Sequence, residues 1–203
     1  MRIVVDFPAP FGPRKPVTVP GRTVKRRVAA GGTGTGLLRP RTPAVQDAIV
    51  LAMAERVVPW DAGCRWEPNA PHAVLAIGDA GRAVLAVNAH AGDASRDCVV
   101  FVWSGTSAAI MGSPNDEALS GHRLYQRGLS SLPWAGQVEH SEWIAKLERQ
   151  NRVHPRHDAA RFAGLVHFIL PLKEGTVEVV AENVTVVRRP GPTASAAAAL
   201  LLQ

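Results

Sequence analysis

The chain of 203 residues has few of the features by which many protein classes are recognised from sequence. It contains only two cysteines, Cys64 and Cys98, and their spacing matches no metal-binding pattern, so we expect two reduced, largely buried thiols. The sequence Gly-x-Ser-x-Gly, a common setting for a nucleophilic serine, is absent. Neither cysteine is accompanied by a recognisable catalytic signature. The sequence therefore gives no reason to expect a covalent nucleophile.

Long apolar runs are also missing. The first residues lack the apolar stretch between a charged start and a small-residue cleavage site that is typical of secretory signals. Residues 196–202 are apolar but too few to cross a bilayer. The glycine-rich residues 31–36 are not followed by the Lys-Ser/Thr pair of a phosphate-binding loop, so we interpret them as a flexible linker. We expect a cytoplasmic protein without membrane contact.

Acidic and aromatic residues are scarce in the first quarter of the chain. Residues 1–52 hold nine Lys or Arg against two acids, with seven prolines, six glycines and no Trp, Tyr or His. Such a segment buries too little apolar surface to offset the entropy of ordering its backbone. We predict a disordered basic extension, or an upstream start before a natural beginning at Met53. Non-specific contact of this arm with nucleic acid is the third and least favoured function.

The rest of the chain predicts one α+β domain over residues 53–189, built on a mostly antiparallel sheet with two short inserted helices. Residues 73–77 and 83–87 flank a glycine-containing turn and predict a hairpin. Residues 98–103 predict a central strand, with residues 108–111 pairing beside it. Further strands are expected at residues 134–138, 166–170, 176–180 and 184–187.

The two helices are predicted from their capping residues. Ser113, followed by proline and acids, predicts a short helix that ends near Gly121. Ser141 predicts a second helix, which ends before Pro155. We expect residues 190–203 to form a flexible C-terminal tail.

Several groups of residues between Gly112 and Glu182 occur in a distinctive order. The main ones are Pro114-Asn115-Asp116-Glu117-Ala118-Leu119, Gly121-His122, Leu124-Tyr125, Asn151-Arg152-Val153-His154-Pro155 and His157-Asp158. In these residues the chain resembles an uncharacterised family of small bacterial proteins with the pattern PNDEALxGHxLY … NRVHPxHD. The resemblance covers roughly a third of the chain. It supports the predicted domain limits and implies no activity, cofactor or partner.

Two polar segments are the candidate functional site. One carries Asn115, Asp116 and Glu117 with His122, and the other Arg152, His154, His157 and Asp158. Both follow helix-start or helix-stop signals, so their side chains are displayed on loops held by regular structure. We expect the two loops to converge on a polar pocket. In that pocket Asn115, Asp116, Glu117, His122 and Arg152 are the candidate binding residues.

The chemistry of the expected pocket stays open. Its function is predicted as a binding or interaction module for an unidentified small molecule or protein. The alternative is a small acid/base or metal-assisted hydrolase, with His154, His157 and Asp158 as candidate catalytic residues beside Asp116 or Glu117. No cofactor can be named, and no metal site is assigned, because His-x-x-His interrupted by proline is a weak signal.

Each of these residues also has a structural interpretation. The acids can cap a helix, Asn115 can bond to the backbone in a turn, and the loop histidines can bond to carbonyl groups. Trp134 and Trp143 are interpreted as core residues. His167, in an apolar strand, is interpreted as a hydrogen-bonded core histidine.

Overall fold

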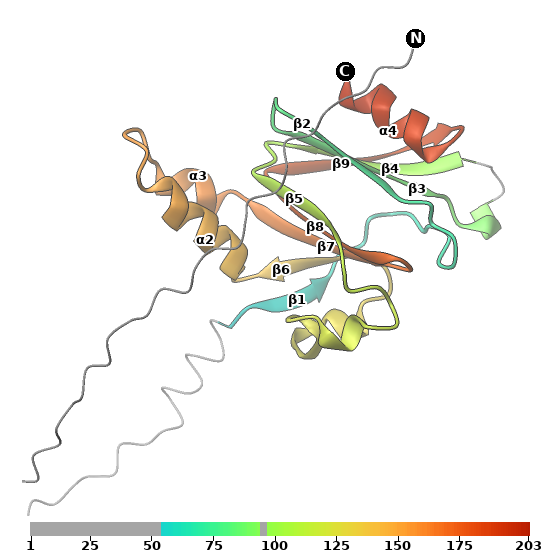
Figure 1. Ribbon diagram of the computed structural model, residues 1–203, viewed down its shortest axis with the longest axis horizontal. Coiled ribbons are helices and arrows are strands. Elements are labelled where there is room, and N and C mark those ends of the chain that lie inside the picture. The colour runs from blue at the N-terminus through green and yellow to red at the C-terminus, as the bar shows by residue number, and fades with distance from the viewer. Residues whose placement is uncertain (1–53, 94–96) are drawn as a thin grey trace, which may run out of the picture. The chain divides into compact units, whose positions relative to one another are not determined.

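The computed structural model describes residues 54–93 and 97–203, so the predicted extension over residues 1–52 lies outside the described part. The described residues form two antiparallel sheets (Figure 1). A five-stranded sheet has the order β1-β6-β7-β8-β5, and a four-stranded sheet has the order β2-β3-β4-β9. The strands of the first sheet are β1 (Arg56–Pro59), β5 (Ala108–Gly112), β6 (Gly136–Glu139), β7 (Val166–Leu172) and β8 (Gly175–Ala181). The strands of the second are β2 (Val74–Gly78), β3 (Arg82–Asn88), β4 (Asp97–Ser104) and β9 (Asn183–Pro190).

This architecture confirms the predicted α+β fold with mostly antiparallel sheets. The predicted hairpin is β2–β3, and its turn uses Gly81 at a positive φ of 70°. The strand predicted to be central is β4, which pairs with β3 on one side and β9 on the other. It is apolar on both faces because both are covered.

The main core lies between the two sheets. Side chains alternate along each strand, so Leu85 and Phe101 of one sheet face Phe168 and Val179 of the other. Trp103 stacks beside Phe101, with ring centroids 5.7 Å apart. The opposite faces of the two sheets are each covered by a different part of the chain.

The outer face of the four-stranded sheet is covered by a helix, α4 (Thr193–Leu201), which corrects the prediction of a flexible tail. Figure 1 shows α4 lying over this sheet. Ala196, Ala197 and Leu200 are buried against Val84 and Val100 of the sheet. Alanine and leucine have the highest helix propensities, and small alanines let the helix approach the sheet closely.

The outer face of the five-stranded sheet is covered by the segment that follows β5 and by two helices. The helix predicted from Ser113 is wrong: 3-10 turns form instead, over Leu119–Gly121, Tyr125–Arg127 and Leu129–Ser131. Leu124 and Leu129 of this segment are buried against the sheet. The turns are linked by Gly128, whose φ is 111° and where a Cβ atom would collide with the Val57 carbonyl oxygen. Close packing of these turns under β1 therefore requires glycine.

The second predicted helix is confirmed as α2 (Glu142–Asn151), in which the Ser141 Oγ accepts a hydrogen bond from the Ile144 amide at 3.2 Å. A further short helix, α3 (Ala159–Ala163), follows the loop. The pairing predicted for β5 is wrong. It pairs with β8 in the other sheet, because the chain crosses between the sheets after β4. Within the described residues, no helix has the length and apolar character needed to span a bilayer.

Candidate functional site

The structure does not bring the two predicted loops together, which corrects the expected pocket. The segment after β5 lies near the β7–β8 turn, whereas the loop between α2 and α3 lies at the other end of the five-stranded sheet (Figure 1). Acid/base or metal chemistry that combines His154, His157 and Asp158 with Asp116 or Glu117 therefore has no shared site. Among the described residues, no group of three or more His, Cys, Asp or Glu side chains is arranged to hold a metal ion.

The residues of the first loop make local contacts. The Asn115 Oδ1 accepts a hydrogen bond from the Ala118 amide at 3.1 Å. Asp116 accepts one from the Lys173 Nζ at 2.7 Å, and this bond lowers the pKa of the Asp116 carboxyl. Glu117 is exposed. These contacts fix a turn at the sheet edge, so this loop has a structural role.

The second loop is closed by a set of polar contacts that we call the loop brace, formed by Glu148, Asn151, Arg152 and His157. The Arg152 guanidinium donates to the Glu148 carboxylate and lowers its pKa. The two ring nitrogens of His157 contact the Glu148 Oε1 and the Asn151 Oδ1, both at 3.0 Å. The brace joins the end of α2 to the start of α3.

The other two residues of this loop are also placed by local contacts. Asp158 caps α3 by accepting a hydrogen bond from the Ala160 amide at 2.9 Å. His154 is exposed, and its Nδ1 accepts from the Arg156 amide at 3.1 Å. The predicted catalytic residues His157 and Asp158 therefore set the position of α3 relative to α2.

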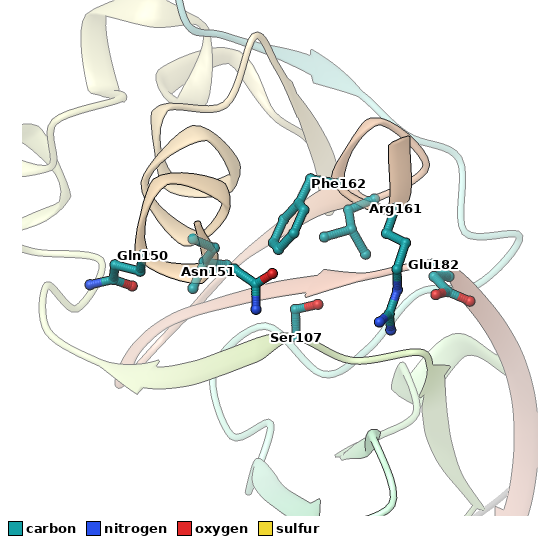
Figure 2. Close-up of a pocket in the computed structure, with 8 residues that line it drawn as sticks. Ser107, Gln150, Asn151, Arg161, Phe162 and Glu182 are labelled. Atoms are coloured by element: carbon teal, nitrogen blue, oxygen red, sulfur yellow. The ribbon is translucent and has the colours of Figure 1, made fainter. Parts of the chain in front are cut away.

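The brace borders a hollow of about 400 Å³ between α2, α3 and the start of β5 (Figure 2). We call it the α2–α3 hollow. Its apolar lining is Leu147, Phe162 and Leu165, and its polar lining is Ser107, Gln150, Asn151, Arg161 and Glu182. Figure 2 shows Asn151, Phe162 and Arg161 directed into the space next to Ser107. Of the predicted candidates, only the second loop is adjacent to this site, through the His157–Asn151 contact.

Two side chains of opposite charge give the hollow its electrostatic character. Arg161 on α3 and Glu182 after β8 both lie at its edge, and within the described residues neither forms an ion pair. The Glu182 side chain lies over Gly105, where a Cβ atom would fall only 2.5 Å from its carboxyl carbon. Both charges are therefore available to a ligand, beside an aromatic wall formed by Phe162.

A second polar feature lies beneath α2, and the meeting of its members was not predicted from the sequence. His167, which is fully buried, contacts the Ser141 Oγ through Nδ1 at 2.8 Å and the Glu178 Oε2 through Nε2 at 3.0 Å. His167 and Glu178 are diagonal neighbours on paired strands, so their side chains share the outer face of the sheet. The interpretation of His167 as a hydrogen-bonded core histidine agrees with these contacts.

The Glu178 carboxylate joins this histidine to a network of charges. It accepts a hydrogen bond from Arg123 at 2.6 Å, and the His122 Nε2 lies 3.4 Å away. Burial raises the pKa of Glu178, but the His167 hydrogen bond and the charges of Arg123, His167 and His122 together outweigh it, so the net pKa is lowered. Arg123 also donates to Glu55, whose other oxygen accepts from the Glu142 amide at the start of α2.

The order Ser141–His167–Glu178 resembles a hydrolytic triad only in composition. The Ser141 Oγ already accepts the capping hydrogen bond of α2, and Trp143 covers His167 with ring centroids 5.2 Å apart. No face of the imidazole is open to a substrate, since its exposure is 0 %. The network anchors α2 to the sheet. No spacing in the sequence marks it, because its members come from distant segments.

A shallow groove of about 440 Å³ lies beside this network, and we call it the β5 groove. Its floor is Ile110 and Glu178, which are directly paired across β5 and β8. Its walls are Arg123 from the 3-10 segment and Trp143, Lys146 and Arg149 from α2, with Glu142 at one end. It therefore combines an apolar strip with several cationic side chains.

The chain was also compared with known proteins. No model of a protein family, no curated protein and no solved structure matches it. The resemblance to a bacterial family therefore stays a prediction.

Proposed function

We propose that the described part of the chain is a binding module that takes a peptide segment or a similar carboxylate-bearing ligand in the α2–α3 hollow. The observation that carries the proposal is the pair Arg161 and Glu182 next to Phe162, with no ion-pair partner for either charge among the described residues. Guanidinium groups bind carboxylates in a bidentate geometry, and a free carboxylate accepts from N–H donors. Peptides supply both groups.

The remaining lining supports a peptide rather than a purely apolar ligand. Ser107, Gln150 and Asn151 offer hydroxyl and amide groups, which pair with main-chain N–H and C=O groups. Phe162, Leu147 and Leu165 offer an apolar surface for one side chain. The loop brace holds the two helices that carry these groups, so the site is set before a ligand arrives.

Location forms part of the same proposal. We place the protein in the cytoplasm, where thiols are kept reduced. Both cysteines are free in the structure, and burial raises the pKa of the Cys64 thiol to about 11, which keeps it protonated.

The proposal is tested with a displayed library of random decapeptides selected on the full chain. Selected peptides are then titrated calorimetrically against the unchanged protein and against Arg161→Gln and Phe162→Ala. We expect each substitution to weaken binding about tenfold or more, equivalent to about 1.4 kcal/mol. Arg156→Gln is the matched control, because Arg156 lies in the neighbouring loop but not in the lining of the hollow; it should change affinity less than about twofold.

Failure to select any binder, or selected peptides whose affinity is the same for all variants, would show that the hollow is not a peptide site.

A further inference from the structure

β5 is an edge strand of the five-stranded sheet and lacks the residues that normally protect an edge. Within the described residues its outer side pairs with no strand, and its sequence is Ala-Ala-Ile-Met-Gly. Charged residues and proline usually discourage pairing with another chain at such positions. The opposite edge, β1, has both in Arg56 and Pro59. β5 has neither, and its Ile110 and Met111 are 55 % and 42 % exposed.

The α2–α3 hollow and the β5 groove lie next to each other along the boundary between α2 and β5. The α2–α3 hollow is lined by Ser107, just before β5, and by Asn151 at the end of α2. The β5 groove is lined by Ile110 in the middle of β5 and by Trp143 in the first turn of α2. α2 and β5 therefore run in opposite directions along a shared boundary. A segment paired with the free edge of β5 would therefore lie beside both surfaces.

The charges along this boundary favour an acidic partner. Lys146, Arg149 and Arg161 line it and form no ion pair with any described residue. Most of the acids are already engaged: Glu178 by Arg123 and the histidines, and Glu142 by a neighbouring arginine. Glu182 is the acid of this boundary that stays unpaired. The surface offered to a ligand is therefore predominantly cationic.

We propose that an extended acidic segment of a partner protein adds to the outer edge of β5 as a further strand, with the side chains of its outer face directed toward α2. This rests on the proposed peptide-binding function and specifies its mode. In strand addition, main-chain hydrogen bonds supply affinity and alternate side chains supply specificity. The acidic side chains on the helix side meet Lys146 and Arg149, and one end of the segment reaches Arg161. A second copy of the chain is a poorer occupant, because it brings a like-charged boundary into contact with the first.

The test uses a synthetic peptide of alternating Glu and Val, acetylated and amidated at its ends, titrated into isotopically labelled full chain and followed by amide NMR shifts. We expect saturable shifts in β5, α2 and α3. A peptide with Lys in place of Glu should have an affinity at least about tenfold lower. Two further peptides carry N-methyl groups on every Glu or on every Val. Because alternate amides of a strand point to the same edge, one methylated peptide should lose binding and the other should retain most of it.

Variants of the protein separate this mode from a general charge effect. Lys146→Glu, in the β5 groove, should weaken binding of the Glu-Val peptide about tenfold. Arg156→Glu makes the same type of charge change outside the groove and should have an effect of about twofold or less.

The outcomes distinguish the two proposals. If the Glu-Val peptide binds, Arg161→Gln weakens it, but both methylated peptides bind equally well, the hollow is a peptide site and strand addition is wrong. If neither this peptide nor any library peptide binds, both proposals are wrong. If light scattering shows that the chain forms dimers that dissociate on Lys146→Glu, the occupant is a second copy, and the partner-segment proposal is overturned.

Discussion

The substitution Glu178→Ala tests whether the charge network beneath α2 holds the described part of the chain together. Glu178 is 14 % exposed, and its carboxylate accepts hydrogen bonds from His167 at 3.0 Å and Arg123 at 2.6 Å. Removing it leaves the buried N–H of His167 without an acceptor, which costs about 1–3 kcal/mol. The contact with Arg123 contributes only about 0–1 kcal/mol, because that side chain is 43 % exposed. We expect the free energy of unfolding to fall by about 1–4 kcal/mol.

The measurement is urea denaturation at pH 7, followed by tryptophan fluorescence. Glu117→Ala is the matched control, since Glu117 is exposed, and it should change the free energy of unfolding by less than about 0.5 kcal/mol. If Glu178→Ala costs no more than this control, the network does not stabilise the fold and the reasoning about His167 is refuted.

The same group also sets a dependence on pH. The pKa of Glu178 is lowered from its ordinary value of 4.5, so the folded state favours the ionised carboxylate. Its contribution to stability is therefore complete above about 4.5 and is lost as the pH falls through the lower folded-state value. The difference in stability between the unchanged protein and Glu178→Gln should be larger at pH 7 than at pH 3. An equal difference at both pH values would contradict the assignment.

Three further predictions concern the packing and the thiols. Leu200→Ala in α4 should reduce the free energy of unfolding by about 2 kcal/mol or more in urea titrations, whereas Leu202→Ala, at an exposed position, should have little effect. Gly128→Ala should destabilise by about 2 kcal/mol or more in the same assay, because its Cβ meets the Val57 carbonyl at positive φ; Gly121→Ala, in open space, serves as its control. Cys64 should react with iodoacetamide at pH 8 roughly a hundredfold more slowly in the native than in the urea-unfolded protein, as measured by mass spectrometry, because its raised pKa of about 11 removes thiolate. Equal rates would show that the thiol is not shielded.

The fold was predictable where local sequence decides the structure. The β2–β3 hairpin follows from glycines between apolar runs, and α2 begins where Ser141 can cap it. The pairing of β5 was not predictable, because a short connection after β4 permits either a hairpin or a crossing to the other sheet. The choice depends on β8, far along the chain. α4 was missed because alanines on both sides of a helix leave no amphipathic stripe to recognise.

The candidate site was predictable only in part, for a similar reason. The second polar loop does border the hollow. Asp158 caps α3, the helix that carries Arg161, and this capping residue is a local signal from which α3 could have been predicted, although no helix was predicted there. The contact of His157 with Glu148 depends on how the loop folds back onto α2. The meeting of Arg161 with Glu182, and of Glu55 with Arg123 and Glu178, arises from tertiary packing that no spacing encodes.

The role of Arg161 as the carboxylate-binding residue of the hollow is tested most directly by a double-mutant cycle. A selected peptide and its variant, with the relevant carboxylate changed to an amide, are each titrated against the unchanged protein and Arg161→Gln. If Arg161 binds that carboxylate, either change alone should weaken binding and the two together should add little more, giving a coupling of about 1 kcal/mol or more. Strictly additive effects would show that the two groups do not meet.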